Sequence, residues 1–317
     1  MTQPERDLTH IPVSHAIDAT HPLYRTFLPI GFERLCTCPP THLNCMTAKE
    51  WIKSQIGVWQ FAYEGRDIRD KNLHPATFPL ALARKVIELF THEGELVLDP
   101  FVGSGTSLLA AQDANRNAVG FDLQPDYIAL CEQRLQSPTL FQQTQQYAIL
   151  DDARHIPLYL RPETVSLIWT SPPYANMLNR KRKNKSRRGS ERQNEQYDKV
   201  EQYSQDSRDL GTMRIVEYTT AMGDIYEQLL PLLKPKAHCV INVPDMWWEN
   251  ERITIHIALI EELRRRGYEF RNTIIWDRTN IVNRIGIFGW PSNYITMGTT
   301  FEYLLDFWRP PEPKASP

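Results

Sequence analysis

The sequence has no apolar run long enough to cross a membrane and no segment typical of a signal peptide. It has only five cysteines among 317 residues, and the odd number argues against a disulfide framework. Its formal net charge of −2 gives no bulk signal for binding a polyanion. We therefore expect a cytoplasmic protein with reduced thiols and no membrane partner.

What the sequence does contain suits a globular α/β protein. Apolar residues make up 41% of the chain, and its length fits one large domain or one domain with a small appendage. Charge is concentrated locally, because residues 180–192 hold eight Lys or Arg against one Glu. Local charge matters more than total charge for binding a polyanion, so this basic run is a candidate nucleic-acid contact.

Residues 96–106 are the stretch around which the chain is organised. A short apolar run ends at Asp99, passes Gly103 and Gly105 and enters a helical pattern, which predicts a strand, a tight loop and a helix start. Glycines let the backbone approach a ligand closely, and a helix start offers unpaired N–H groups. A dinucleotide fold would want a third glycine where Leu108 stands, and the Gly-Lys-Ser/Thr of a phosphate loop is absent. An ordinary glycine turn is the alternative.

A second unusual stretch follows the strand predicted at residues 164–169. Residues 170–174 read Thr-Ser-Pro-Pro-Tyr. Two prolines followed by an aromatic residue at the carboxyl end of a strand do little for packing, so a functional role is favoured.

Together the two stretches resemble the motifs of S-adenosylmethionine-dependent methyltransferases that modify exocyclic amino groups in DNA. Residues 99–106 match the family's Asp-Pro-Phe-x-Gly-Ser-Gly-Thr motif at every fixed position, and residues 171–174 match its Ser-Pro-Pro-Tyr motif. The resemblance implies an α/β class I methyltransferase fold, with a mostly parallel, Rossmann-like, seven-stranded sheet, an antiparallel last strand and helices on both faces. It also implies S-adenosylmethionine as the cofactor.

The resemblance and the strand pattern together assign the cofactor-binding residues. The segment at 74–79 resembles the motif that helps hold the methionine end of the cofactor, and Asp152 fits the family's adenine contact. Asp122 ends a strand predicted at residues 118–122, where a carboxylate can accept both ribose hydroxyls; a helix N-cap is its alternative role. The predicted set is His74, Phe78, Asp99, Pro100, Phe101, Gly103, Ser104, Gly105, Thr106, Asp122 and Asp152.

Methylation of an aromatic amine explains the second motif. The nitrogen lone pair must leave conjugation and point at the methyl donor, and two hydrogen-bond acceptors beside the amine achieve this. Ser171 Oγ and the Pro172 carbonyl are the natural acceptors, and Tyr174 offers a stacking face for a flipped base. The predicted catalytic residues are Ser171, Pro172, Pro173 and Tyr174.

The identity of the methylated base depends on Ser171. Family members with Ser before Pro-Pro usually methylate cytosine N4, whereas those with Asp or Asn usually methylate adenine N6, so the resemblance favours cytosine. Adenine-N6 methylation is the nearest alternative. An RNA amino-methyltransferase and a binding protein on a degenerate methyltransferase scaffold are further ones. Cytosine-C5 chemistry is disfavoured, because no cysteine nucleophile lies in a matching context.

Double-stranded DNA is the expected partner, contacted by a basic insert at residues 175–212. The basic run directly follows the catalytic motif, at the sheet edge where DNA must lie; a solvated loop is the alternative. Trp290 lies in a segment resembling a loop of cytosine-N4 enzymes and is expected against the flipped base. The predicted DNA-binding residues are Arg180, Lys181, Arg182, Lys183, Lys185, Arg187, Arg188 and Trp290. A cognate restriction endonuclease, an orphan role and the oligomeric state stay open.

Domain boundaries are predicted at residues 70 and 310. Residues 1–70 form an N-terminal arm and helix, residues 71–310 the catalytic domain and residues 311–317 a tail. Within the arm, a helix is predicted over residues 46–59, with a capping box and with Trp51, Ile52 and Ile56 facing the core.

Four residues of the arm have the chemistry of metal ligands. Cys36, Cys38, His42 and Cys45 could form a Cys₃His zinc site. Their spacing is not a standard one, and the proline pair at residues 39–40 restricts the loop between them. We therefore expect plain reduced cysteines and no metal.

Overall fold

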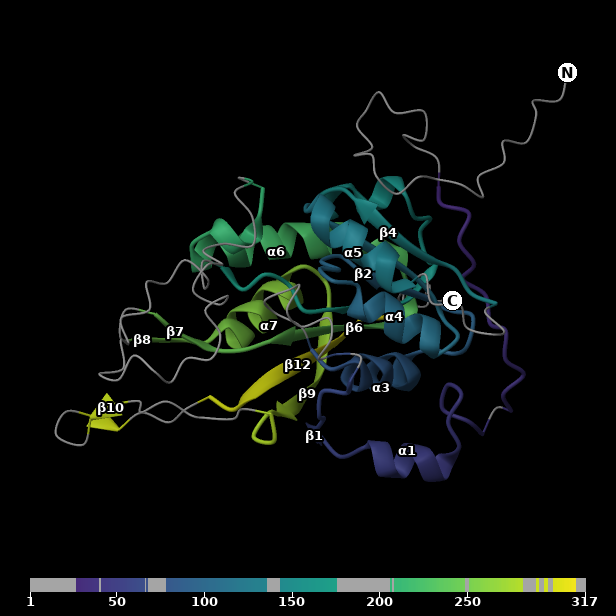
Figure 1. Ribbon diagram of the computed structural model, residues 1–317, viewed down its shortest axis with the longest axis horizontal. Coiled ribbons are helices and arrows are strands. Elements are labelled where there is room, and N and C mark those ends of the chain that lie inside the picture. The colour runs from purple at the N-terminus through teal and green to yellow at the C-terminus, as the bar shows by residue number, and fades with distance from the viewer. Residues whose placement is uncertain are drawn as a thin grey trace, which may run out of the picture.

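The computed structural model describes residues 27–39, 41–65, 67, 78–135, 143–175, 206, 208–248, 251–281, 289–290, 294–295 and 299–311. Figure 1 shows a central sheet with helices packed around it.

Eight strands form the central sheet, in the spatial order β1-β9-β12-β6-β5-β2-β3-β4. Strand β12 runs antiparallel to both of its neighbours, and all other neighbouring strands of this sheet are parallel. The predicted fold class is confirmed, with β1 as one strand more than the seven predicted. The strands are β1 (Val58–Gln60), β2 (Leu96–Asp99), β3 (Asn117–Asp122), β4 (Gln146–Leu150), β5 (Val165–Thr170), β6 (Leu233–Val243), β9 (Glu269–Asp277) and β12 (Phe301–Trp308).

Helices cover both faces of the sheet, because its central strands are apolar on both sides. Every residue of β2 and β5 is buried, as expected for strands of a covered parallel sheet. In β2, Leu96 and Leu98 belong to the core formed with α6 and α7, whereas Val97 belongs to the core formed with α3, α4 and α5. The helices are α3 (Leu80–Phe90), α4 (Thr106–Asp113), α5 (Pro125–Leu135), α6 (Ile215–Leu229) and α7 (Ile255–Arg265).

Short elements complete the described part of the chain. None of the described helices is long and apolar enough to cross a membrane. The short elements are α1 (Ala48–Ser54), the 3₁₀ turns η1 (Ala153–Leu158), η4 (Leu210–Thr212) and η5 (Leu230–Leu232), and the hairpin pairs β7 (Met246–Trp248) with β8 (Glu251–Ile253) and β10 (Gly289–Trp290) with β11 (Tyr294–Ile295).

Helix α1 begins as predicted but ends early. Thr47 and Glu50 form the capping box: Glu50 N donates to Thr47 Oγ1 at 3.3 Å, and Thr47 N donates to Glu50 Oε2 at 2.8 Å. The predicted buried face is wrong for two of its three residues, because the helix stops at residue 54 and Ile52 and Ile56 are 67% and 65% exposed. Trp51 is partly buried and packs against the core as predicted.

The residues after α1 form β1 instead of a longer helix. Trp59 is buried in β1, which pairs in parallel with β9 at the edge of the sheet. Since β1 lies within the predicted N-terminal arm, part of that arm completes the sheet.

Candidate active site

The candidate site lies where β2, β3 and β5 end. In the sheet, β3 lies on one side of β2, and β5, which comes later in the sequence, lies on the other side. Such a reversal opens a crevice at the carboxyl ends of the strands. A pocket lies there, and both predicted motifs contribute to its wall. The predicted residues that line it are Phe78, Pro100, Phe101, Gly103, Ser104, Thr106, Asp122, Asp152, Ser171, Pro172, Pro173 and Tyr174.

The glycine loop after β2 has a shape that side chains would prevent. Gly103 and Gly105 have φ of 49° and 82°, both in the left-handed region. A Cβ atom on Gly105 would lie 2.8 Å from Cys131 Sγ, which is closer than real Cβ contacts. Gly105 is also the N-cap of α4 and provides no side-chain hydrogen bond there. The loop thus brings bare backbone and a helix start to the edge of the pocket.

Arg134 of α5 holds this loop in place by hydrogen bonds, a role that was not predicted from the sequence. Its Nη1 donates to the Ser104 carbonyl at 2.6 Å, and it lies 3.2 Å from Ser104 Oγ and 3.1 Å from Thr106 Oγ1. Arg134 is 7% exposed, so these charge-assisted bonds are shielded from water. The sequence gives no signal for this contact, because Arg134 lies 28 positions after Thr106 in an ordinary helical pattern.

Asp99 joins the two motifs. Its Oδ1 accepts a hydrogen bond from Thr170 Oγ1 at 2.6 Å and one from Phe101 N at 3.0 Å. Its Oδ2 accepts from the Ser107 hydroxyl. Burial raises the pKa of Asp99 to about 6, although these hydrogen bonds act to lower it. Asp99 is 2% exposed, and Thr170 directly precedes Ser171, so the carboxylate positions both turns.

Asp122 lines the pocket beside the glycine loop. Its Oδ2 accepts from Gly103 N at 3.0 Å, and its Oδ1 accepts from Gln124 N at 2.9 Å. Each oxygen retains a lone pair, so the carboxylate can accept two further hydrogen bonds. Burial raises the pKa of Asp122 to about 7; the charges of Asp209 and Asp99 act in the same direction, and the two backbone bonds oppose them.

Two carboxylates follow β4 on the same wall, where the sequence predicted one. Asp152 accepts from Arg154 N at 2.9 Å and from Arg154 Nη1 at 2.8 Å. Asp151 accepts from the Tyr159 hydroxyl at 2.7 Å and lies 2.8 Å from His155 Nδ1. Both carboxylates line the pocket. Asp151 is therefore a second candidate for the contact assigned to Asp152.

The Ser-Pro-Pro-Tyr turn closes the opposite side of the pocket. Ser171 is half-buried, and its hydroxyl forms a hydrogen bond with the Tyr174 hydroxyl. Tyr174 is buried, so most of its ring packs in the core while the residue still contributes to the wall. Pro172 and Pro173 leave two successive positions without a backbone N–H. The turn therefore presents oxygen acceptors without competing donors from the prolines.

A buried polar chain behind the turn was not predicted. Asn242 Nδ2 donates to Glu302 Oε2 at 2.6 Å and lies 3.4 Å from both Ser171 Oγ and Tyr174 Oη. Glu302 in turn accepts from Arg278. Asn242 is 1% exposed. A buried amide that contacts both hydroxyls fixes their orientation more firmly than water would.

Two sets of residues that the sequence did not assign to the site, Asn242 and the pair Arg208 and Asp209, belong to or adjoin predicted elements. Asn242 is near the end of β6, the strand next to β5, so its place at the carboxyl edge was the available signal. Arg208 and Asp209 also line the pocket, although sequence reasoning counted them as part of the insert. Asp209 is fixed by capping η4 through Gly211 N at 2.7 Å, and Arg208 pairs with Asp206 at 2.6 Å.

Several predicted contacts lie outside the described residues. His74 is one of them, and the side chain of Trp290 is another, although its backbone forms part of β10. The cofactor and DNA contacts assigned to these residues stay predictions. The basic residues outside the described part are Arg180, Lys181, Arg182, Lys183, Lys185, Arg187 and Arg188.

Residues 43–133 match a family of N6 and N4 methyltransferases described as DNA methylase. The chain is similar to the Type II methyltransferase M.BglI of Bacillus subtilis, with 35% identity over 95 residues, 30% of this chain and 26% of that protein. It is also similar to the Type II methyltransferase M.HindIII of Haemophilus influenzae, with 51% identity over 101 residues, 26% of this chain and 33% of that protein. The chain thus spans about a quarter to a third of the length of these relatives. Among solved structures, it is similar to an SAM-dependent methyltransferase of Methanosarcina mazei, with a TM-score of 0.44 and 14% identity over 72% of this chain and 98% of that chain.

Proposed function

We propose that this chain, which by its residues 43–133 belongs to the family of S-adenosylmethionine-dependent DNA amino-methyltransferases, transfers a methyl group to an exocyclic amine of DNA. The observation that carries this proposal is the hydrogen bond from Thr170 to Asp99, at 2.6 Å. It fixes the turn with the family's cofactor motif against the turn with its catalytic motif, at one pocket.

S-adenosylmethionine is the cofactor, and the pocket has features that suit it. Asp122 can accept two further hydrogen bonds, as the two ribose hydroxyls require. Asp151 and Asp152 offer acceptors for the adenine amino group on the neighbouring wall. Gly103 lines the pocket with left-handed backbone and without a Cβ atom, which leaves room for close approach of a ligand. When bound, the cofactor supplies an electrophilic methyl group on a sulfonium.

The chain's own residues hold and aim the substrate amine. In this proposal, Ser171 Oγ and the Pro172 carbonyl each accept a hydrogen bond from one N–H of the amine, which draws the nitrogen lone pair out of the ring. The same two acceptors stabilise the positive charge that develops on nitrogen, and the methylated amine becomes neutral by releasing one proton to water. Asn242 is a positioning residue, because its amide contacts the Ser171 and Tyr174 hydroxyls and holds them in one orientation.

Within this function, we infer cytosine N4 as the acceptor. The support is Ser171, since members of the family with Ser before Pro-Pro usually modify cytosine. Adenine N6 is the second candidate, because the matched family includes N6 and N4 enzymes alike.

Double-stranded DNA is the proposed substrate, with the basic run at residues 180–192 as its phosphate contact. The similar proteins named Type II methyltransferases support a role in restriction and modification, either beside a cognate endonuclease or alone.

Nucleoside analysis tests this function directly. The purified chain is incubated with S-adenosylmethionine carrying a labelled methyl group and with unmethylated double-stranded DNA, which is then digested to nucleosides. We expect label in N4-methylcytosine. Label in N6-methyladenine alone would keep the enzyme class and reverse the choice of base. No labelled nucleoside from DNA, with label in RNA treated in parallel, would contradict the proposed substrate.

A further inference from the structure

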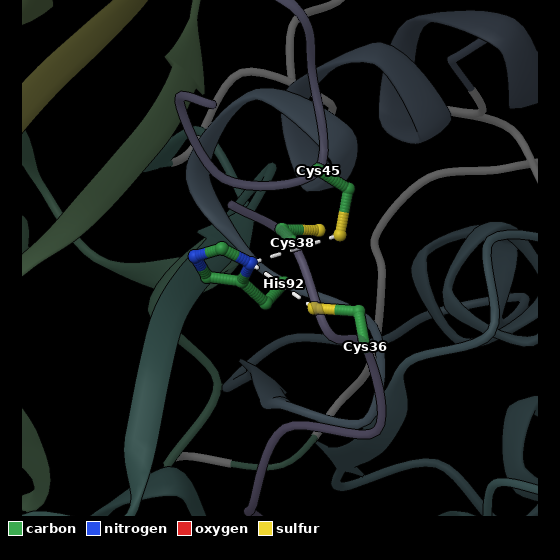
Figure 2. A group of neighbouring side chains, drawn as sticks. All are labelled: Cys36, Cys38, Cys45 and His92. Atoms are coloured by element: carbon green, nitrogen blue, oxygen red, sulfur yellow. Dashed lines mark hydrogen bonds between the residues drawn. The ribbon is translucent and has the colours of Figure 1, made fainter. Parts of the chain in front are cut away.

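Three cysteines and one histidine lie close together beside the start of β2, whereas the pocket lies beside its end. The ligand atoms of Cys36, Cys38, Cys45 and His92 all lie within 4.8 Å of one another. Figure 2 shows the three sulfur atoms and His92 Nδ1 turned toward a common centre. Nδ1 lies 3.3 Å from Cys36 Sγ and 3.7 Å from Cys45 Sγ. His42, which the sequence spacing suggested, is not a member of this group.

The histidine comes from a different part of the fold than the cysteines. His92 lies 56 positions after Cys36, in the turn between α3 and β2. This turn precedes β2, whereas the pocket lies where β2 ends, so the cluster and the pocket occupy opposite edges of the sheet. The cluster therefore does not belong to the methyl-transfer site.

Hydrogen bonds and an ion pair hold the cysteine-bearing segment and the turn with His92 in place. Leu35 N donates to the Glu93 carbonyl at 2.8 Å, and Glu93 N donates to Cys45 Sγ at 3.4 Å. His92 N donates to Glu95 at 2.8 Å, and Glu95 also pairs with Lys234 at 3.2 Å. N–H donors to a thiolate and a fixed ligand backbone are the surroundings that metal sites use.

We propose that Cys36, Cys38, Cys45 and His92 bind one Zn²⁺ ion. A tetrahedral site with Zn–S of about 2.3 Å and Zn–N of about 2.0 Å places sulfur and nitrogen about 3.5 Å apart and two sulfurs about 3.8 Å apart. The two sulfur–nitrogen distances in the cluster lie on either side of the first value. Three soft thiolates and an imidazole are a donor set that selects zinc over magnesium or calcium.

The site is structural, because four protein ligands leave no open coordination position. It fastens the segment at residues 36–45 to the turn that leads into β2. Binding of zinc to the folded chain and not to the unfolded chain stabilises the fold. Removal of the metal should therefore lower the melting temperature by about 5 °C or more.

Elemental analysis of the wild-type chain tests the site without any variant. The full chain is purified without added metal and reduced, and we expect one zinc per chain. After zinc is exchanged for Co²⁺, we expect the visible absorption of a tetrahedral, thiolate-bound Co²⁺ ion. A wild-type chain that contains no zinc, and that gains no such absorption when Co²⁺ is added, would overturn the proposal.

Variants then identify the ligands. Cys36→Ser with Cys38→Ser, and separately His92→Ala, should lose the zinc and the Co²⁺ absorption. Two matched controls should keep both: Cys239→Ala, a buried cysteine of β6, and His42→Ala, the histidine of the arm. Loss of zinc in His42→Ala with full retention in His92→Ala would refute this ligand set. If the double variant does not fold, the wild-type spectrum and the two histidine variants still decide the question.

Discussion

The hydroxyl of Ser171 contacts Tyr174, three positions away in the same turn, and Asn242 of β6, 71 positions away. In the proposed mechanism Ser171 Oγ accepts a hydrogen bond from the amine N–H as nitrogen becomes cationic. Ser171→Ala removes this acceptor and leaves the cofactor wall intact. Turnover should fall about ten- to a hundredfold, since a hydrogen bond to a charged group contributes about 1.5–3 kcal/mol.

Single-turnover kinetics and titration with S-adenosylmethionine measure the two effects of Ser171→Ala separately. Cofactor affinity should change less than about threefold, because the residues proposed to contact the ribose and adenine, Asp122, Asp151 and Asp152, are pocket residues other than Ser171. Unchanged turnover would exclude Ser171 as an acceptor.

If Asp122 binds the ribose as proposed, its charge should make cofactor binding depend on pH. Burial raises the pKa of this carboxyl to about 7 in the free protein. In the proposed contact, two ribose hydroxyls would donate to the ionised form, so binding would favour loss of the proton. Affinity should therefore rise with pH up to about 7 and level off above it, with a loss of up to about tenfold per pH unit below.

Calorimetric titration of S-adenosylmethionine between pH 5.5 and 8.5 (about the range in which a group with this pKa titrates) measures this dependence. Asp122→Asn should bind more weakly at high pH and show a flat profile. Equal affinity of the variant and the wild type at high pH would remove the ribose role.

At the scale of elements, the glycine loop and α4 form one unit held against α5. Gly105→Ala should destabilise it, because residue 105 has φ of 82° and the new Cβ would meet Cys131 Sγ at 2.8 Å. The left-handed conformation and the clash together should cost about 2–4 kcal/mol. Urea denaturation measures this decrease in stability.

A matched glycine provides the control for this prediction. A Cβ on Gly65 would have nothing within 4 Å, so Gly65→Ala should change the free energy of unfolding by less than about 0.5 kcal/mol. Equal effects of the two substitutions would contradict the structural account of the loop.

The sequence predicts those elements whose signal is local. Strand β2 ends at Asp99 and β3 at Asp122, as predicted, because buried parallel strands are short apolar runs and an acid ends each run here. Strand β1 could not be predicted, since its three residues become a strand only by pairing with β9, where Val58 lies opposite Ile275. A local pattern favoured a longer helix there.

The same distinction between local and long-range signals applies to the residues of the candidate site. The two motifs indicate their turns because each is contiguous in sequence. The contacts of Arg134 with the glycine loop and of Asn242 with Ser171 span 28 to 71 positions. Such contacts depend on how α5 and β6 pack, which no spacing in a single sequence reveals.

At the scale of the whole molecule, a net charge of −2 does not attract DNA. Electrostatic attraction to the phosphates must therefore come from a local concentration of positive charge, and the basic run is the proposed source. Its seven predicted DNA-binding side chains can be replaced by Gln. Each replacement that removes a cation from a DNA phosphate should reduce the steepness of log affinity against log salt by about 0.9.

Fluorescence anisotropy with a short duplex, at several salt concentrations, measures this slope. As a control, the same number of Lys and Arg residues outside the run is replaced, with the same change in total charge. An unaltered slope in the first variant would mean that the run is solvated and does not bind DNA.

The hydrogen bond between Thr170 and Asp99 links laterally adjacent strands whose residues are 71 positions apart. This hydrogen bond requires that β5 lie beside β2, but it does not depend on which of the two strands comes first in the sequence. A chain in which β5 precedes β2 in the sequence could form the same hydrogen bond, provided that its new termini lie away from the pocket. The linear order of the two motifs is thus free to vary while their meeting point stays the same.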